Sequence, residues 1–184
     1  MKEIETERLR LRLWRKDDAG GLYAYAKDPD VGPHAGWKPH ESVNESLHII
    51  KNLFIPNKVW AITLKNSGQI IGSIGFEPDK RRPGIKSKEL GYALSKEYWG
   101  NGLMTEAAKA AVDFAFENYN LDILAVCTGQ PNKRSQRVIQ KCGFTYEGTE
   151  RMVYVTYNGT IRDSRCYSLL REEWEDMKAG RANE

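Results

Sequence analysis

The glycines Gly100 and Gly102 are the residues whose type and spacing point most directly to chemistry. They follow a strand-like run at 89–94 and precede a helical run that begins at Met104. Because glycine has no side chain, the backbone N–H groups of such a turn can converge, and the start of a helix adds about half a positive charge. The spacing therefore predicts an anion cradle suited to a pyrophosphate, although an isolated Gly-x-Gly is also typical of a simple tight turn.

Two familiar phosphate-binding motifs are absent from the sequence. A P-loop requires GxxxxGK followed by Ser or Thr, but no lysine follows Gly102. A dinucleotide fold requires GxGxxG directly after the first strand, with an acidic residue about 20 positions further on. Each hydrogen bond to a charged group contributes about 1.5 to 3 kcal/mol, so three or four backbone amides can hold a diphosphate without a lysine.

The cysteines and histidines form no recognisable metal or redox motif. Cys127, Cys142 and Cys166 are odd in number and contain no CxxC pair, which predicts reduced thiols that serve in packing. The three histidines lie between positions 34 and 48, but their spacing matches no common set of metal ligands. We expect no metal site.

Composition indicates one domain and excludes several classes of protein. The chain has 184 residues, of which 40% are hydrophobic and 29% charged, so we expect one domain over 1–176 and a tail over 177–184, frayed from 178 onward. The net charge of +3 is too small for a dedicated nucleic-acid binder. No apolar run approaches the roughly 20 residues of a membrane span. No secretory signal is visible, so we expect a cytoplasmic protein.

The N-terminal half shows alternating strand and helix signals. Leucines alternate with arginines at 8–13, which predicts a half-buried strand. Ser42 and Glu45 form a capping-box pattern at the start of the second expected helix. The elements expected here are a strand at 9–14, helices at 17–28 and 42–53 around a loop at 32–39, a hairpin of strands 59–64 and 70–76, and a solvated basic loop at 77–88.

The C-terminal half predicts a parallel crossover followed by a hairpin. Small residues at helical spacing over 104–115 favour close packing of a helix on a sheet. We expect strands at 89–94 and 123–127 on either side of this helix, a helix at 135–141 that ends at Gly143, and strands at 152–157 and 160–168 joined by a two-residue turn at Asn158-Gly159. The order βααβββαβαββ describes an α+β domain around one mixed sheet.

Around the glycine turn, at 99–104, the sequence resembles the GNAT superfamily of N-acetyltransferases. The central motif of that superfamily is a strand followed by Gln/Arg-x-x-Gly-x-Gly/Ala at a helix start. Gly102 matches this motif, whereas Trp99 and Met104 replace its first and last residues. A wider set of segments resembles the ribosomal-protein N-terminal acetyltransferase branch. They are Thr6-Glu7-Arg8-Leu9-x-Leu11-Arg12, Glu89-Leu90-Gly91-Tyr92, Tyr98-Trp99-Gly100-x-Gly102 with Thr105-Glu106-Ala107, and Asn132-x-x-Ser135-x-x-Val138-Ile139-x-Lys141-x-Gly143-Phe144. The resemblance covers roughly residues 5 to 172.

This resemblance implies a single-domain GNAT fold, with a mixed, mostly antiparallel sheet whose central parallel strands splay apart and are flanked by helices. It implies that acetyl-CoA is the donor, with its pantetheine arm along the edge of strand 89–94 and its pyrophosphate on the amides of 100–105. The cofactor-binding residues expected from it are Tyr92, Leu94, Trp99, Gly100, Asn101, Gly102, Leu103, Met104, Thr105, Asn132 and Ser135.

Acyl transfer from a thioester needs a neutral amine, donors for the developing oxyanion and a proton for the leaving thiolate. The resemblance implies Glu89 as base, acting through a water, and Ser135 as acid; a strand-end Glu and an ordinary helix residue are the alternatives. Asn132 can be an N-cap, a cofactor contact or both. Tyr98 and Tyr146 are reserve proton donors, or packing residues.

The acceptor is expected to be a primary amine. The loop with His34, Trp37 and His40 should border its pocket in this architecture, unless these residues lie on a surface loop. The basic run from Lys80 to Lys88 can meet an acidic substrate or the 3′-phosphate of CoA, but is more typical of a solvated loop. We expect a protein N-terminal α-amine as the acceptor, with a small-amine acetyltransferase and a non-catalytic acyl-CoA sensor as the alternatives, in a monomer or a homodimer.

Overall fold

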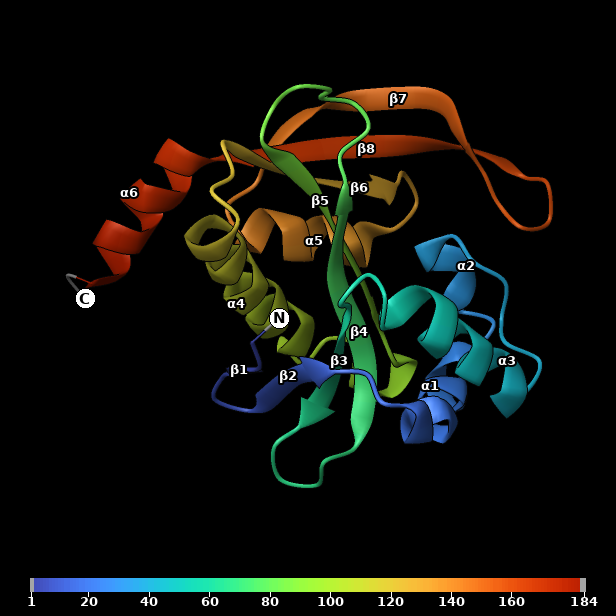
Figure 1. The fold of residues 1–184 in the computed structure, drawn as a ribbon. Helices are drawn as coiled ribbons and strands as arrows, with labels where there is room; N and C mark the ends of the chain where they lie inside the picture. The colour runs from blue at the N-terminus through green and yellow to red at the C-terminus, as the bar shows by residue number, and fades with distance from the viewer. Residues whose placement is uncertain (1, 183–184) are drawn as a thin grey trace.

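An eight-stranded mixed sheet with the order β1-β2-β3-β4-β5-β6-β8-β7 runs through the molecule (Figure 1). The computed structural model describes residues 2–182. The strands are β1 (Ile4–Glu5), β2 (Leu9–Leu13), β3 (Trp60–Leu64), β4 (Ile70–Pro78), β5 (Ser87–Leu94), β6 (Ile123–Gly129), β7 (Thr145–Val155) and β8 (Ile161–Leu170). The helices are α1 (Ala19–Ala26), α2 (Gly32–Ala35), α3 (Val43–Ile49), α4 (Leu103–Asn118), α5 (Lys133–Lys141) and α6 (Arg171–Ala182).

Alternation along the central strands divides the core between the two faces of the sheet. Trp60 and Ile62 of β3 enter a large core that also contains the buried alanines of α4, whereas Ala61 enters a second core with α1. The small side chains of α4 allow its backbone to lie close to the sheet, as the sequence predicted. The sheet is therefore covered by helices on both faces, which is the α+β architecture expected.

The sheet opens in its middle, between β5 and β6. These two strands are parallel, and they pair only through Ser87↔Ile123, Lys88↔Leu124 and Glu89↔Ala125. Beyond these pairs, β5 continues along β4 to Leu94, while β6 continues along β8 to Gly129. The expected splay of the two central strands is thus confirmed, and it leaves a wedge between them.

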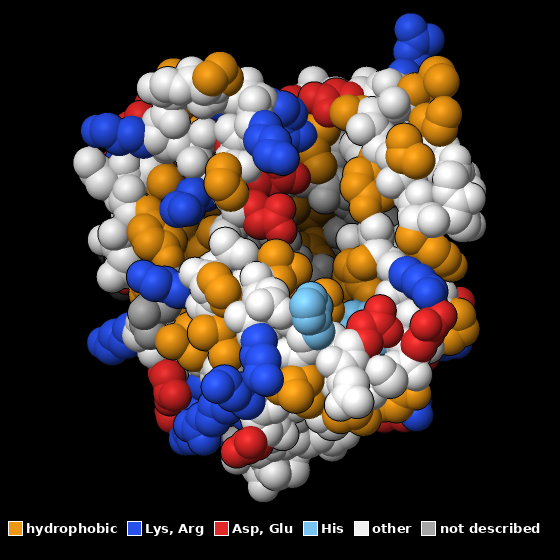
Figure 2. Space-filling model, turned by 45° about the vertical axis from the view of Figure 1, so that its right-hand side comes forward, with side chains coloured by type: hydrophobic (Ala, Val, Ile, Leu, Met, Phe, Trp, Pro, Cys, Tyr) orange, Lys and Arg blue, Asp and Glu red, His pale blue; other side chains and the backbone are white. Residues whose placement is uncertain are grey.

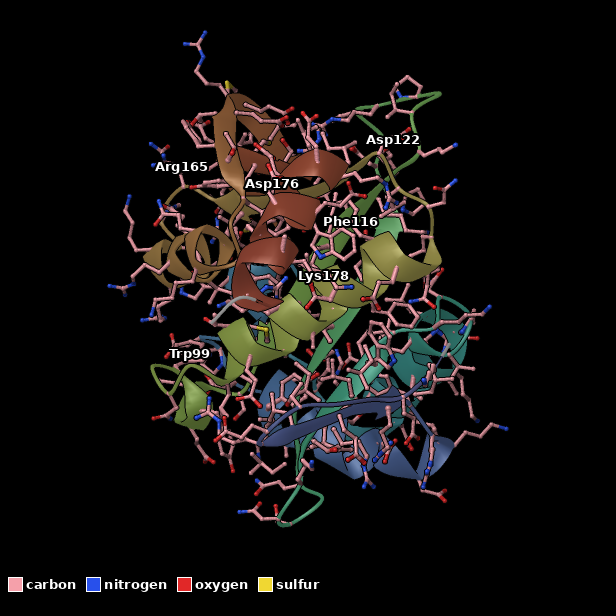
Figure 3. All side chains as sticks on the ribbon, turned by 90° about the vertical axis from the view of Figure 1, so that its left-hand side faces the viewer. Trp99, Phe116, Asp122, Arg165, Asp176 and Lys178 are labelled. Carbon is pink, nitrogen blue, oxygen red and sulfur yellow. The ribbon has the colours of Figure 1, made fainter. Side chains whose placement is uncertain are left out.

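Helix α6 corrects the sequence-based expectation for the C-terminus. Lys178, predicted to begin a frayed tail, lies inside α6 and forms an ion pair of 2.5 Å with Glu117 of α4. The ring of Trp174 stacks on Phe116 with a centroid distance of 5.2 Å, and Figure 3 shows Lys178 and Phe116 where α6 crosses α4. Residues 178–182 are therefore helical because they pack on α4; the remainder of the predicted tail, 183–184, lies outside the described residues.

Other differences from the predicted elements are local. Strand β1 and helix α2 were not expected, and the 3-10 segment Lys16–Asp18 precedes α1. Ser42 caps α3 as predicted, because its hydroxyl accepts from the backbone N–H of Glu45 at 3.1 Å. The expected two-residue turn at Asn158-Gly159 is wrong: Thr156 and Thr160 close a three-residue loop, in which Gly159 has φ +82°. Such a loop is the next commonest hairpin connection.

None of the helices within residues 2–182 combines the length and the apolar character that crossing a bilayer requires.

Candidate active site

The wedge between β5 and β6 opens into a cleft of about 1020 Å3. This volume is at the upper end for small-molecule sites. Figure 2 shows the hollow in the surface, with acidic side chains beside it and hydrophobic side chains around it. Its walls come from α2, the end of β4, β5, the segment 98–105, β6, α5 and the hairpin of β7 and β8.

One end of the cleft is formed by the glycine loop at the start of α4. Gly100 and Gly102 have φ of +83° and +77°, a left-handed conformation that other residues rarely adopt. A Cβ on Gly100 would meet no atom within 4 Å, so the space above the loop is open. The first N–H groups of α4, including those of Leu103 to Thr105, have no acceptor within the helix. This arrangement has the geometry of an anion cradle, and the diphosphate of coenzyme A at this loop stays a prediction.

The back of the glycine loop is braced by the N-terminal segment of the chain. The guanidinium of Arg8 donates to the backbone oxygen of Asn101 at 3.1 Å and to Glu106 of α4 at 2.7 Å. The hydroxyl of Thr6 also donates to Glu106. Gly100, Gly102 and Leu103 line the cleft, but Asn101, predicted to bind the cofactor, does not. Its backbone oxygen accepts from Arg8, which does not line the cleft either.

Trp99 and helix α5 form the adjoining wall. The indole N–H of Trp99 donates to the backbone oxygen of Leu94 at 2.8 Å, and the guanidinium of Arg134 lies 4.1 Å from the centre of a Trp99 ring. Arg137 and Lys141 line the cleft from the same helix. Positive charge therefore gathers beside the glycine loop, where a cofactor with several phosphates needs it.

Ser135 lies in the first turn of α5 and faces β5. Its Oγ lies 2.8 Å from the hydroxyl of Tyr92, and its backbone N–H donates to Oδ1 of Asn132 at 3.2 Å. Asn132 is thus the N-cap predicted from the sequence, and it lines the cleft together with Ser135 and Tyr92. Burial raises the pKa of Tyr92, so this hydroxyl stays protonated and can support Ser135 as a donor.

Glu89 lies where β5 and β6 part, and its side chain is 33% exposed. Burial raises its pKa, the guanidinium of Arg81 lowers it, and the carboxylates of Asp79, Glu77 and Glu150 raise it further; the net direction is upward. A carboxylate with a raised pKa at the base of a cleft is a candidate general base.

The basic loop after β4 is exposed at Lys80 and over 83–86, as its composition predicted, but two of its arginines are not solvated. Arg81 turns inward and lines the cleft, where it contacts Glu89 at 3.1 Å. Arg82 bridges Asp79 and Glu147 at 2.7 and 2.5 Å. The side chain of Asp79 is fully buried, and this buried acid holds the arginines inside.

The predicted acceptor residues separate in the structure. His34 lines the cleft, and burial together with Arg134 and Arg162 lowers its pKa. Trp37, also predicted to bind substrate, does not line the cleft. Gly36 turns the chain with φ +92°, so the Trp37 ring packs over Gly32 and lies 5.2 Å from the ring of His40.

The two reserve proton donors also differ in position. Tyr98 lines the cleft, and its hydroxyl donates to Gln69 at 3.0 Å. Tyr146 lies outside the cleft lining on the edge strand β7, where its hydroxyl lies 2.7 Å from Thr149. An edge-strand side chain that faces solvent is poorly placed to protonate a leaving group in the wedge.

The β7–β8 hairpin forms the wall opposite the glycine loop. The sequence predicted the hairpin but did not place it at the site. Val153, Tyr154 and Arg162 line the cleft, and Tyr154 and Arg162 donate to the backbone oxygens of Gly36 and Pro33 at the ends of α2. The run 152–161 contains no charged residue, although 29% of the chain is charged. This uncharged run, next to the turn at Asn158-Gly159, is the sequence feature from which a role of the hairpin in the site could have been predicted.

Within residues 2–182 there is no group of three or more His, Cys, Asp or Glu side chains able to hold a metal ion.

Comparison with known proteins identifies the family. A model of the acetyltransferase (GNAT) domain matches residues 8–145, so the chain belongs to this family. It is 28% identical over 173 residues to the uncharacterized N-acetyltransferase YoaA of Bacillus subtilis (strain 168), with 91% of this chain and 96% of YoaA covered. It is 38% identical over 94 residues, half of each chain, to the putative ribosomal N-acetyltransferase YdaF of the same organism.

A solved structure of a GNAT-family acetyltransferase from Bacillus anthracis superposes with a TM-score of 0.83 at 23% identity, covering 94% of this chain and all of that one. The fold and the family expected from the sequence are therefore confirmed, and the chain is an N-acetyltransferase. Acetyl-CoA is the acetyl donor used by GNAT enzymes, and the open glycine loop fits its diphosphate.

Proposed function

We propose that this N-acetyltransferase transfers the acetyl group of acetyl-CoA to the α-amine of a protein N-terminus, in the cytoplasm. The observation that supports this most is the continuity of one cleft, which runs from the glycine loop past Glu89 to the β7–β8 hairpin. A phosphate cradle, a carboxylate and the β7–β8 hairpin are thus arranged in the order in which donor, reaction centre and polypeptide acceptor would lie.

In this proposal acetyl-CoA, when bound, supplies the activated acyl group as a thioester. Residues Gly100 to Thr105 hold its diphosphate, while Arg134 and Arg137 contribute positive charge. Glu89 takes the proton of the amine, directly or through a water. Ser135, whose Oγ lies 2.8 Å from the Tyr92 hydroxyl, donates to the leaving sulfur.

An α-amine is favoured over a lysine side chain by its lower pKa. At pH 7, neutralising an α-amine of pKa near 8 costs about 1.4 kcal/mol, whereas a lysine of pKa near 10.4 costs about 4.6 kcal/mol. The uncharged run 152–161 supports a polypeptide acceptor, because its Val155 and Ile161 are 64% and 51% exposed and its Val153 and Tyr154 line the cleft. The similarity to YdaF, named as a putative ribosomal N-acetyltransferase, supports the same acceptor.

The alternatives are acetylation of a small amine and a non-catalytic acyl-CoA sensor. The open cleft and its carboxylates Glu77, Glu89 and Glu150 are also compatible with a small cationic amine. Release of free CoA should be measured with hexapeptides bearing a free N-terminus, with the same peptides N-terminally blocked and containing one lysine, and with spermidine.

We expect turnover with the free hexapeptides, none with the blocked ones, and strong loss in Glu89→Gln. Turnover with spermidine alone would favour the small-amine function, and tight acetyl-CoA binding without any turnover would favour the sensor. Full activity of Glu89→Gln would remove Glu89 from the mechanism.

A further inference from the structure

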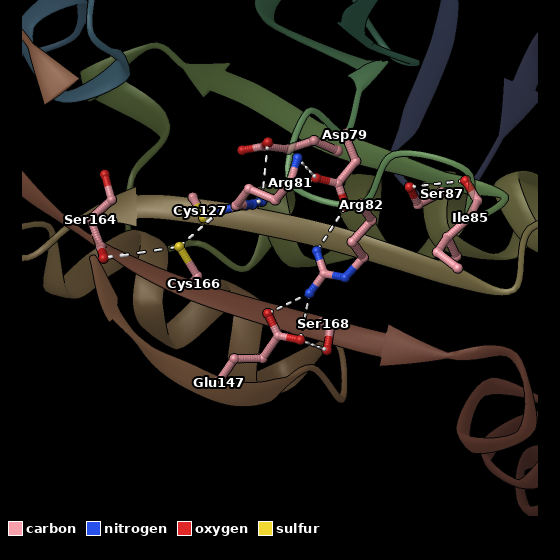
Figure 4. Close-up of polar contacts among 11 residues, drawn as sticks. Asp79, Arg81, Arg82, Ile85, Ser87, Cys127, Glu147, Ser164, Cys166 and Ser168 are labelled. Carbon is pink, nitrogen blue, oxygen red and sulfur yellow. Dashed lines mark hydrogen bonds and ion pairs between the residues drawn. The ribbon is translucent and has the colours of Figure 1, made fainter. Parts of the chain in front are cut away.

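The short loop after β4 is folded into the base of the wedge and fixed there by a buried acid. The backbone N–H of Arg81 donates to Oδ1 of Asp79 at 3.0 Å, and Arg82 pairs with Oδ2 of Asp79 at 2.7 Å. Arg82 also reaches Glu147 of β7, whose carboxylate accepts from Ser168 of β8 at 2.8 Å (Figure 4). The position of Arg81 is therefore set by the fold, since its neighbours connect the loop to β7 and β8.

The guanidinium of Arg81 joins three strands at the point where β5 and β6 separate. Its Nη2 contacts Oε2 of Glu89 on β5 at 3.1 Å. Its Nη1 donates to the Sγ atoms of Cys127 on β6 and Cys166 on β8, the latter at 2.9 Å (Figure 4). Thiols are weak acceptors, so the carboxylate of Glu89 is the strong partner of this end of the guanidinium. The side chains of Arg81 and Glu89 are 25% and 33% exposed, so the pair is partly shielded from water.

The remaining groups around Glu89 act against its ionised form. Burial disfavours the charge, and the carboxylates of Glu77 on β4, Asp79 in the loop and Glu150 on β7 repel it. The facing thiols of Cys127 and Cys166 stay neutral, because burial raises the pKa of each. Arg81 is the cation that opposes all of these effects on Glu89.

We propose that Arg81 is a positioning residue for the base: it holds the Glu89 carboxylate in place and in its ionised form, and thereby sets the lower pH limit of acetyl transfer. This inference rests on the proposed function, in which Glu89 accepts the proton of the amine. The loop thus has a role in the reaction without any contact with the reacting atoms being required.

The direction of the pH effect follows from the signs of the contributions. When Arg81 is replaced by an uncharged residue, burial and the neighbouring carboxylates still raise the pKa of Glu89, and the cation that lowered this pKa is absent. Glu89 then becomes protonated at a higher pH, so activity is lost earlier as the pH falls. An opposite charge in direct contact commonly shifts a carboxyl by one unit or more, so we expect kcat/KM at the acidic end to fall about tenfold or more in Arg81→Met. At alkaline pH the two proteins should be similar.

The test compares Arg81→Met, Arg81→Lys and Lys86→Met with the unaltered protein. Arg81→Lys keeps the charge and should restore most of the acidic limb. Lys86 is an exposed lysine of the same loop that does not line the cleft, so Lys86→Met removes one charge without touching Glu89. Circular dichroism checks folding, and Arg81→Lys remains informative if the Met variant is unstable.

Two readouts separate this inference from the proposed function. The titration of the Glu89 carboxyl carbon, assigned by its loss in Glu89→Gln, is followed by NMR in the protein without ligands. The pH profile of kcat/KM is measured with a hexapeptide bearing a free N-terminus. We expect the Glu89 midpoint to move to higher pH in Arg81→Met. The kcat/KM of Arg81→Met, divided by that of the unaltered protein at each pH so that the titration of the peptide amine cancels, should fall toward acidic pH; neither quantity should change in Lys86→Met.

An unmoved Glu89 titration in Arg81→Met overturns the inference, while inactivity of Glu89→Gln would still support Glu89 as the base. If the Glu89 titration moves in Arg81→Met but the pH profile of kcat/KM does not, Glu89 is not the base. That result overturns both this inference and the role of Glu89 in the proposed function. Equal loss of the acidic limb in Arg81→Met and Arg81→Lys would show that charge is not the relevant property, and would also overturn it.

Discussion

The hydroxyl oxygen of Tyr92 lies 2.8 Å from Oγ of Ser135, and this contact joins β5 to the first turn of α5 across the wall of the cleft. A serine hydroxyl alone is a weak acid. With Tyr92 behind it, Ser135 has a fixed orientation and a neighbour that stays protonated, because burial raises the pKa of Tyr92.

Ser135→Ala should lower turnover more than it lowers affinity for acetyl-CoA. Loss of a positioned proton donor costs roughly 100-fold or more in rate, and we expect Tyr92→Phe to show a smaller loss in the same direction. Steady-state kinetics and calorimetric titration with acetyl-CoA measure the two quantities. Tyr146→Phe is the control, because it removes a hydroxyl outside the cleft lining. An unchanged kcat in Ser135→Ala would exclude this residue from the mechanism.

Gly102→Val should weaken acetyl-CoA binding at least tenfold, about 1.4 kcal/mol. Gly102 has φ +77° at the N-cap of α4, where a branched side chain strains the turn that presents the amides. Gly68→Val is a matched control, because Gly68 has φ +70° in the β3–β4 turn with open space around it. Both variants should lose similar thermal stability, and only Gly102→Val should lose affinity. Equal affinity in the two variants would reject the cradle.

Arg8→Ala should weaken acetyl-CoA binding several-fold, although Arg8 does not line the cleft. Its guanidinium holds both Asn101 and Glu106, so its loss should loosen the turn that presents the amides. Arg10→Ala is the matched control, since Arg10 lies two residues further along the chain on β2 and pairs with Glu5 at the surface. If calorimetry gives the same affinity for both variants, the brace has no part in cofactor binding.

Val155→Ser should reduce kcat/KM for a long peptide acceptor and leave that for a dipeptide amide unchanged. Val155 is 64% exposed on the hairpin, where only the longer acceptor would cover it. Val43→Ser serves as control, because Val43 is 45% exposed at the start of α3. Equal effects on both acceptors would show that the hairpin does not recognise the polypeptide beyond its first residues.

The parts of the site that could be predicted from the sequence are those whose conformation is determined by residues close together in the chain. The glycine turn, the Asn132 cap and the parallel crossover each depend on residues within one short segment, so their patterns were sufficient. The alternation of β5 placed Glu89 on one face with Gly91 and Ala93, but it did not indicate what that face meets. The pairing of β5 with β6, which ends at Glu89, determines this.

The parts that were missed depend on contacts between distant segments. A charged loop in solvent and a charged loop around a buried acid have the same composition, so the inward turn of Arg81 was not visible before Asp79 was seen to be buried. Arg8 and Glu106 are 98 positions apart, and each had been noted only as part of a family pattern. Trp37 was expected at the pocket because of its loop, but the left-handed Gly36 directs it toward Gly32.

The early end of the β5–β6 pairing has a consequence for selectivity. Where the strands part, backbone groups that an intact sheet would pair must be hydrated in the free enzyme. A carrier arm with amides of its own can form the hydrogen bonds that this water made to the backbone. An alkyl chain of equal length would displace the water and leave the backbone groups without hydrogen bonds. We therefore expect the parted strands to discriminate between thioesters by the polarity of the arm that bears them.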